Sequence, residues 1–415
     1  MQSAREAVPF RPYHPGTQPP YDASAYGSTH KRHPQDPLIR LPHTVTETTG
    51  PRFSPAHFPP IPDLSVVDGK AALGERIIVH GRITDEAGRP ISDTIVEIWQ
   101  ANASGRYQHP GDQHDAPIDS NFRGEGRVYT DDQGWYRFTS IKPGAYPWRN
   151  HHNAWRPNHI HFSFFGSGFA ARLITQMYFP GDPLLALDPI FLSIPDEAAR
   201  NRLVCALDMT VTEPEWALGY RFDVVLRGRE ATPMETWAVP SATSSQTIGP
   251  FWHLIEHPEW ADLTRFGASG AKVTLSGSVV DGDGNPVTDA AVELWQSDPP
   301  ADESFPGFGR CRTDQRGEFR FTTVKPGPVP GRGNAQQAPH FAIALHARGL
   351  LKALMTRAYF EGDPLNETDP LLSAVEDPRR RATLLARPES ADRWRLDIRL
   401  QRGLHGETET VFLDI

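Results

Sequence analysis

Apolar and polar residues alternate along much of this chain, in short runs separated by turns rich in glycine, proline and aspartate. Alternation with a period of two places apolar side chains on one face of a β-strand and polar side chains on the other. Short runs joined by turns such as residues 85–90 are typical of antiparallel strands in a β-sandwich. The strands predicted in the first half are residues 76–84, 94–100, two within 127–138, 158–165, 173–179 and 220–226.

The same pattern then occurs a second time, and the segments at 74–81 and 96–100 return 196 residues further along the chain. The second copy keeps the Trp-Gln strand end, the Lys-Pro-Gly turn and the Tyr-Phe-x-Gly-Asp-Pro segment. A repeat of this length indicates one fold present twice. The matching segments are 74–81 with 270–277, 96–100 with 292–296, 130–138 with 313–321, 142–144 with 325–327, 178–183 with 359–364, and 48–51 with 247–250.

The repeat divides the chain into four parts. We expect an extended arm over residues 1–60 with one short helix, a first domain over 61–228, a linker over 229–243 and a second domain over 244–415. A further short helix is predicted near residues 196–203, where acidic residues begin the segment and arginines end it. The sequence therefore predicts an all-β protein with two homologous antiparallel β-sandwich domains, short helices and an extended amino-terminal arm.

Composition excludes several classes of function. The 415 residues include 42 Lys+Arg and 51 Asp+Glu, a net charge of −9, and no basic run suited to nucleic acid. Cys205 and Cys311 are too few for a disulfide framework. We expect a cytoplasmic protein without a membrane span, because there is no signal-peptide pattern and no run of 18 apolar residues.

Candidate chemistry gathers in residues 142–162, which end in a His-x-His pair. On a strand, His159 and His161 point to the same face and can converge on one ion. No Cys, Asp or Glu stands at a zinc spacing nearby, and the other candidate donors are the phenols of Tyr107 and Tyr146. A phenol, with a pKa of about 10, binds as phenolate at neutral pH only to a highly charged cation such as ferric iron.

A structural role for these four residues is the alternative, because a His-x-His pair taken alone is more often not a metal site. The second copy serves as a control. Opposite Tyr146 it has Val329, and opposite His161 it has Ala342. His340 replaces His159, and Glu303 falls near the position of Tyr107. Loss of three of the four donors from one copy, while the scaffold motifs persist, favours a single metal site in the first half.

These motifs, above all the stretch from Lys142 to His161, resemble the intradiol ring-cleaving dioxygenases over nearly the whole chain. The first half resembles the iron-bearing β subunit of their protocatechuate-cleaving members, and the second half the iron-free α subunit. The resemblance implies one Fe(III) per chain and the cleavage of protocatechuate with O2 to 3-carboxy-cis,cis-muconate, in the β-ketoadipate pathway of aromatic catabolism. It further implies a homo-oligomer of the fused chain.

The resemblance also assigns residues to roles. The iron ligands are Tyr107, Tyr146, His159 and His161, and Tyr146 is the ligand that substrate displaces and that then takes a substrate proton. Arg156 stabilises a carbanion-like carbon, and Gln176 shapes the pocket. Arg348 meets the substrate carboxylate, a planar anion suited to a guanidinium. The other substrate-binding residues implied are Tyr26, Trp99, Trp148, Ile190, Thr247, Gly249 and Pro250.

Phe251 departs from the family pattern, which has tyrosine after this Gly-Pro pair, and one hydrogen bond near the substrate is therefore missing. Two other functions stay open on the sequence. One is a related intradiol enzyme acting on catechol or hydroxyquinol, against which Arg348 argues. The other is a non-catalytic β-sandwich binding protein with structural tyrosines and histidines.

Overall fold

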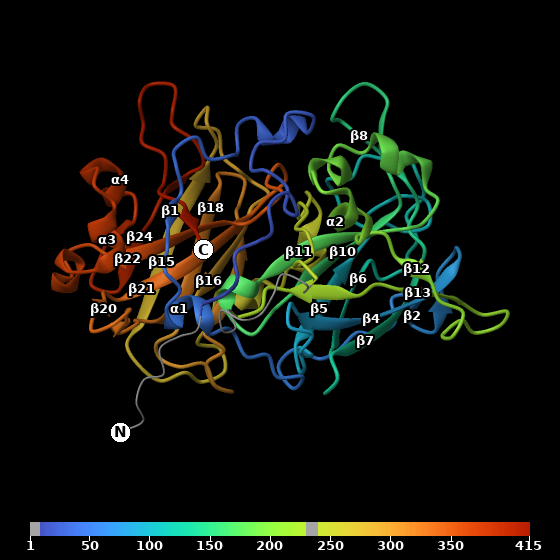
Figure 1. Cartoon of the computed structure of the whole chain (residues 1–415), viewed down its shortest axis with the longest axis horizontal. Helices are drawn as coiled ribbons and strands as arrows, with labels where there is room; N and C mark the ends of the chain where they lie inside the picture. Colours follow the sequence, from blue (N-terminus) through green and yellow to red (C-terminus); the bar gives the residue numbers. More distant parts are fainter. Residues whose placement is uncertain (1–8, 230–239) are drawn as a thin grey trace.

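The computed structural model describes residues 9–229 and 240–415, and these residues form mainly β-strands (Figure 1). Most of the predicted linker, residues 229–243, lies outside this description, as do the first eight residues of the arm. The arm crosses to the second half of the chain. There its strand β1 (Ile39–Arg40) pairs in parallel with β26 (Leu413–Asp414), close to the carboxyl terminus (Figure 1).

The first half builds two main sheets. One has the order β11-β10-β5-β6, and in the other β12, β13, β4 and β14 form a row with β7 paired to β4. Two further pairs, β2 with β3 and β8 with β9, are short hairpins. The strands are β2 Val66–Val67, β3 Lys70–Ala71, β4 Arg76–Asp85, β5 Ile95–Trp99, β6 Glu125–Tyr129, β7 Trp135–Ile141, β8 Tyr146–Trp148, β9 Ala154–Arg156, β10 His159–Phe164, β11 Leu173–Tyr178, β12 Ala206–Leu207, β13 Leu218–Arg221 and β14 Val224–Leu226.

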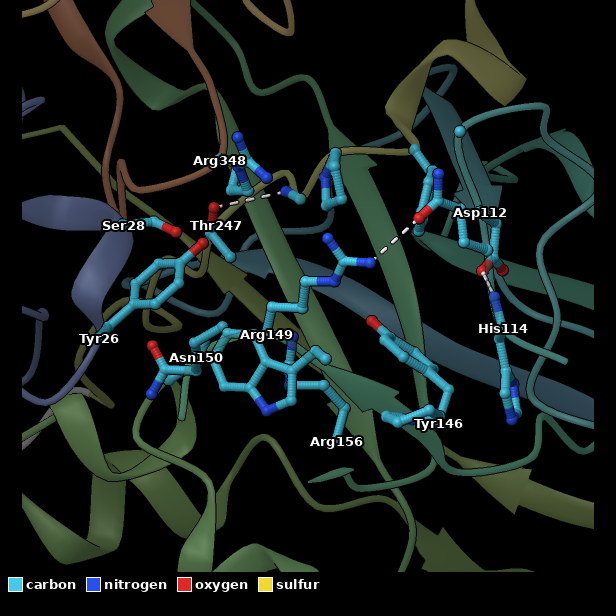
Figure 2. A pocket seen from close by; sticks show the side chains of 18 residues that line it. Tyr26, Ser28, Asp112, His114, Tyr146, Arg149, Asn150, Arg156, Thr247 and Arg348 are labelled. Carbon is cyan, nitrogen blue, oxygen red and sulfur yellow. Dashed lines mark hydrogen bonds between the residues drawn. The ribbon is translucent and has the colours of Figure 1, made fainter. Parts of the chain in front are cut away.

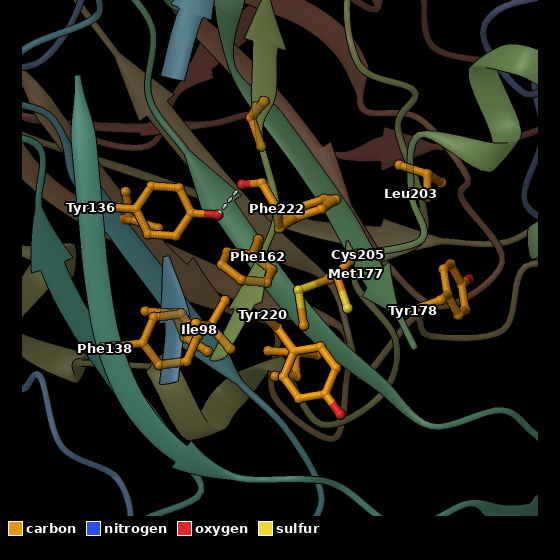
Figure 3. Packing of buried hydrophobic residues seen from close by; sticks show 14 of the residues in the cluster. Ile98, Tyr136, Phe138, Phe162, Met177, Tyr178, Leu203, Cys205, Tyr220 and Phe222 are labelled. Carbon is orange, nitrogen blue, oxygen red and sulfur yellow. Dashed lines mark hydrogen bonds between the residues drawn. The ribbon is translucent and has the colours of Figure 1, made fainter. Parts of the chain in front are cut away.

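A single hydrophobic core joins the two sheets of the first half (Figure 3). Ile98 and Phe162 from one sheet and Phe138 from the other are each at most 1% exposed. Burying such side chains contributes about 1.5–3 kcal/mol each. The hydroxyl of Tyr136 within this core donates to the carbonyl of Phe222 at 2.6 Å, so this polar tip is satisfied.

The second half repeats strand pairings of the first half. Trp295 faces Ala342 across β16 and β21, as Trp99 faces His161 across β5 and β10. A continuous sheet of eleven strands runs through this half, and a separate hairpin pairs β19 with β20. The strands are β15 Lys272–Val280, β16 Ala291–Trp295, β17 Phe308–Arg312, β18 Glu318–Val324, β19 Val329–Pro330, β20 Gln336–Gln337, β21 His340–His346, β22 Leu354–Phe360, β23 Leu385–Pro388, β24 Arg393–Arg395 and β25 Ile398–Arg399.

The sheets are mixed, which corrects the expectation of purely antiparallel strands. β4 pairs in parallel with both β13 and β14, and β15 does the same with β24 and β25. The predicted strand 220–226 is interrupted at Phe222 and Asp223, so that β4 receives two short partners in succession. Sequence alternation carries no sign of strand direction, because side chains alternate in both kinds of sheet.

Helices are few and short. The segment predicted over 196–203 contains α2 (Glu197–Asn201), and the carboxylate of Asp196 caps it by accepting from the amide of Ala199 at 2.7 Å. The arm has the expected short helix, α1, and in addition the 3-10 turn η1. The helices are α1 Val45–Thr48, α3 Pro370–Ala374 and α4 Pro378–Ala382, with 3-10 turns η1 Gly27–Thr29, η2 Phe169–Ala171, η3 Pro183–Leu187, η4 Phe191–Ser193, η5 Trp252–Ile255, η6 Pro258–Ala261 and η7 Pro364–Glu367. None of the described helices has the length and apolar character needed to cross a membrane.

A buried ionic network lies between the two halves. The guanidinium of Arg310 donates to both carboxylate oxygens of Glu97, at 2.9 and 2.8 Å, and its Nε donates to Glu293 at 3.0 Å. Arg172 binds Glu293 with two further hydrogen bonds. All four side chains are at most 4% exposed. Since each charge has an opposite partner, the network fixes the two halves against each other.

Candidate functional site

Two histidines project side by side from β10. His159 and His161 are 2% and 3% exposed, and their ring centroids lie 5.0 Å apart. Nδ1 of His159 lies 2.6 Å from the carbonyl oxygen of Pro157, which makes Nδ1 the protonated nitrogen and leaves the lone pair on Nε2. The ring of His161 stacks on Trp99 at 4.9 Å. Burial lowers the pKa of both imidazoles well below its ordinary value, so both are neutral.

Two phenols complete the group. Tyr107 follows β5 in a loop and Tyr146 begins β8, and their rings meet edge to face at 5.5 Å. The hydroxyl of Tyr146 lies 3.3 Å from Nε2 of His159. The Tyr107 hydroxyl is buried and makes no hydrogen bond with the described residues. Burial raises the pKa of Tyr107 well above 10, so without a cation beside it this phenol stays protonated.

The donor set fits a ferric ion. Among the described residues no three His, Cys, Asp or Glu side chains gather as a metal site, so a metal bound here depends on the phenols. Two neutral imidazoles and two phenols converge, and the Tyr107 hydroxyl is unsatisfied within the protein. A buried polar atom without a partner is costly, and coordination removes that cost. Zinc in such a place would favour thiolates, and calcium carboxylates.

A buried arginine adjoins these rings. Arg156 lies opposite Tyr146 in the β8–β9 hairpin. Its Nη2 donates to Gln176 at 2.6 Å and to Asp188 at 3.2 Å, and its guanidinium lies 5.3 Å from the Trp148 ring. The amide of Gln176 in turn donates to the carbonyl of Thr247, near the start of the second half, at 2.9 Å. The cation is therefore neutralised, hydrogen-bonded and held in place from both halves of the chain.

A cavity of about 460 Å³ opens in front of Tyr146 and Arg156 (Figure 2). The arm, the first half and the second half all supply parts of its wall. The Thr247–Gly249 turn is close-packed, because a side chain added at Gly249 would stand 3.2 Å from the ring of His161. The wall consists of Tyr26, Ser28, Gly111, Asp112, Gln113, His114, Tyr146, Pro147, Trp148, Arg149, Asn150, Arg156, Ile190, Thr247, Gly249, Pro250, Phe251 and Arg348.

Comparison with known proteins decides the family. A family model described as "Dioxygenase" matches residues 48–228 and 261–402, and one described as "Protocatechuate 3,4-dioxygenase beta subunit N terminal" matches residues 10–44. The chain belongs to the intradiol ring-cleaving dioxygenases. This confirms the resemblance inferred from the sequence, and makes the protein an oxidoreductase of the dioxygenase class, which excludes the non-catalytic alternative.

Individual relatives agree with the duplication. Over 222 residues the dioxygenase is 56% identical to the protocatechuate 3,4-dioxygenase beta chain of Burkholderia cepacia, covering 53% of this chain and 94% of that relative. It is 37% identical over 196 residues to the alpha chain of the Pseudomonas putida enzyme, covering 41% and 96%. A catechol 1,2-dioxygenase of Candida albicans is 31% identical over 163 residues, covering 36% and 51%. Members of this family generally use non-haem Fe(III).

Most of the predicted substrate-binding residues of the dioxygenase lie in the cavity wall, namely Tyr26, Trp148, Ile190, Thr247, Gly249, Pro250 and Arg348. Trp99 and Gln176 lie one layer further in, where Trp99 stacks on His161 and Gln176 binds Arg156. Arg348 is 49% exposed, with its Nε 3.4 Å from Asp289. The hydroxyl of Tyr26 accepts a hydrogen bond from the amide of Gly349 at 3.0 Å, which ties the arm to the loop of Arg348.

Several wall residues of the dioxygenase were not singled out from the sequence. Arg149 extends across the cavity from the hairpin, and its Nη2 donates to the side chain of Gln113 at 3.1 Å (Figure 2). Asp112 orders this loop by accepting from the amides of Tyr107 and His114. Arg149 stands next to Trp148 in the stretch that carries the predicted ligands, and this proximity is the signal that would have identified it.

Proposed function

We propose that this dioxygenase cleaves protocatechuate, 3,4-dihydroxybenzoate, between its two hydroxyl-bearing carbons, using O2 and one Fe(III) per chain. The product is 3-carboxy-cis,cis-muconate, which belongs to the β-ketoadipate route of aromatic catabolism. One observation carries the proposal: two phenols and two neutral imidazoles converge beside a cavity that also contains arginines. The protocatechuate-cleaving relatives support the choice of substrate.

Tyr107, Tyr146, His159 and His161 would hold the iron. Ferric iron there supplies Lewis acidity, which lowers the pKa of a catechol and favours its binding as a dianion. The hydrogen bond from Nδ1 of His159 to the Pro157 carbonyl keeps Nε2 free for the metal. The stacked Trp99 fixes the plane of the His161 ring, so the two imidazoles are oriented before a metal binds.

Tyr146 and Arg156 carry the proton and charge chemistry. Of the four proposed ligands only Tyr146 lines the cavity, so its phenolate oxygen is placed to accept a proton from an incoming substrate hydroxyl. Arg156, directly opposite in the hairpin, holds a fixed positive charge beside the ring that is cleaved. Gln176 and Asp188 keep that guanidinium in one position.

The substrate carboxylate would bind at the other end of the cavity. Arg348 supplies a partly exposed guanidinium there, and the Tyr26 hydroxyl, already accepting from Gly349, has its proton available for donation. Trp148 and Ile190 form apolar walls for the ring, and Thr247, Gly249 and Pro250 close the cavity from the second half. Catechol, which lacks the carboxylate, cannot use the Arg348 end.

The proposal includes the domain organisation. We infer an arm over residues 1–60, two homologous β-sandwich domains over 61–228 and 244–415, and a linker over 229–243, with several copies of the fused chain in the assembly. The equal registers of Trp99 with His161 and of Trp295 with Ala342 support the duplication.

Oxygen consumption tests the proposal. The iron-loaded enzyme is expected to consume one O2 per protocatechuate and to form the carboxymuconate, with a kcat/KM for catechol lower by about tenfold or more, the value of one charge-assisted contact. Equal kcat/KM for the two substrates, or no turnover of protocatechuate by iron-loaded protein, would overturn it.

A further inference from the structure

The second half has a buried region at the position that the proposed metal site occupies in the first half. Nδ1 of His340 bonds the carbonyl of Ala338 at 2.7 Å, as His159 bonds Pro157. Its Nε2 lies 3.0 Å from the hydroxyl of Thr46, so the arm takes the place that the Tyr146 hydroxyl has beside His159 in the first half. Val329 at the place of Tyr146 offers no donor. This buried region is therefore not arranged as a metal site.

In the second half the buried arginine stands on a different strand from that of Arg156 in the first half. Gln337 occupies the position of Arg156, and Arg357 occupies that of Gln176. Arg357 donates to Gln337 at 2.7 Å and to Glu47 of the arm at 2.7 Å. The arm thus neutralises the cation of the second half with a carboxylate.

Outside that buried region a cavity of about 240 Å³ remains, which we call the second cavity. Four positions of its wall have counterparts in the wall of the first cavity. Gly331, Arg332 and Gln337 correspond to Trp148, Arg149 and Arg156, and Leu371, two residues after Asp369, corresponds to Ile190, two residues after Asp188. The full wall is Arg40, Leu41, Pro42, Thr44, Gly331, Arg332, Ala335, Gln337, Pro370, Leu371 and Ala374.

The wall specifies the chemistry of an occupant. Arg40 and Arg332 are exposed at the rim, and among the described residues neither forms an ion pair. No acidic residue belongs to the wall, and Leu41, Pro42, Pro370 and Leu371 make much of it apolar. Cavities for drug-sized ligands measure about 300–1,000 Å³, so this smaller one suits a single ring. A guanidinium pair above an apolar slot favours a carboxylate on that ring.

We propose that the second cavity binds a one-ring carboxylate, without cleaving it. The occupant places its ring against Leu371 and its carboxylate between Arg332 and Arg40. It needs no catechol hydroxyls, because the described residues behind the cavity do not form a group of three His, Cys, Asp or Glu side chains that could hold a metal. Arg332 repeats the position of Arg149, so a guanidinium stands at this place of the hairpin in both halves.

Binding of 4-fluorobenzoate to the iron-loaded full chain, followed by fluorine NMR, tests this. We expect two bound populations, one broadened by the paramagnetic iron and one not. Arg332→Glu should weaken the unbroadened population by about tenfold or more, the value of a charge-assisted hydrogen bond, and Leu371→Trp should abolish it by filling the cavity. Arg149→Glu, the matched change in the first half, should weaken only the broadened one.

The exposed surface change Arg316→Glu controls for net charge and should leave both populations. A single population in the wild-type chain, or an unbroadened one indifferent to Arg332→Glu, would overturn the proposal. Arg332 is exposed, so its replacement tests the site even if Leu371→Trp fails to fold. Because no turnover is measured, the result does not depend on protocatechuate being the substrate of the first half.

Discussion

Tyr146 and Arg156 are direct cross-strand neighbours in the β8–β9 hairpin, which places a phenol beside a buried guanidinium. Burial raises the pKa of Tyr146, and the positive charge of Arg156 opposes that rise. At the same register the second half has Val329 and Gln337. One hairpin therefore supplies an ionisable oxygen and its counter-charge in the first half, and neither in the second.

Removing the Tyr107 hydroxyl tests the donor set. Tyr107→Phe should reduce bound iron and weaken the visible phenolate-to-iron absorption band, because one of two phenolate donors is lost. Metal analysis and the absorption spectrum measure this. His340→Ala, which removes the histidine equivalent to His159, should leave the iron content unchanged, and equal iron loss in both variants would contradict a site confined to the first half.

The two buried arginines form a matched pair for separating stability from catalysis. Arg156→Met and Arg357→Met should each lower the free energy of unfolding by about 3–5 kcal/mol, because each leaves a buried carboxylate, Asp188 or Glu47, without its cation. Only Arg156→Met should also lower kcat in the protein that remains folded. Denaturant unfolding and steady-state kinetics measure the two effects, and a similar loss of kcat in Arg357→Met would refute the assignment.

Arg348 should determine the preference for an acidic ring. Arg348→Ala is expected to raise KM for protocatechuate by about tenfold and to leave KM for catechol nearly unchanged, since a hydrogen bond to a charged group contributes about 1.5–3 kcal/mol. Parallel kinetics with both substrates decide this. If both KM values rose together, Arg348 would be supporting the loop rather than binding the carboxylate.

His43 should make stability depend on pH. Burial lowers its pKa from 6.5 to about 4, and its Nδ1 accepts a hydrogen bond from the amide of Phe10 at 2.8 Å. Between these pH values the unfolded chain binds a proton that the folded chain does not. The contribution of neutral His43 to the free energy of unfolding is therefore fully present above pH 6.5. It decreases as the pH falls toward 4, by at most about 1.4 kcal/mol per pH unit.

His43→Gln is the comparison for that prediction, because a glutamine can accept the same hydrogen bond without titrating. The variant should lose stability less steeply than the wild-type protein over this pH interval, as measured by denaturant unfolding at several pH values. Identical slopes would show that His43 keeps its ordinary pKa.

Sequence alone predicted what depends on local periodicity. The i, i+2 spacing of His159 and His161 specifies a shared face once the segment is a strand, and β10 places both rings together. The duplicated motifs predicted one fold present twice, and the matching registers agree with this, since His340 faces Tyr359 as His159 faces Tyr178.

Local periodicity could not predict contacts between segments that are distant in the sequence. Glu47 binds Arg357 across 310 residues, and Arg149 reaches Gln113 from a different loop. Neither pair has a spacing that a strand or helix period would reveal, because the contact depends on how the arm and the loops cross the sheets. The parallel pairing of β4 was missed for a similar reason.

The composition of the metal centre tests the account most directly. Metal analysis of the iron-loaded chain together with resonance Raman spectroscopy should give one iron per chain and vibrational modes of iron-bound tyrosinate, both lost in a Tyr107→Phe, Tyr146→Phe double variant. Iron bound without tyrosinate modes, or modes that survive in the double variant, would contradict it.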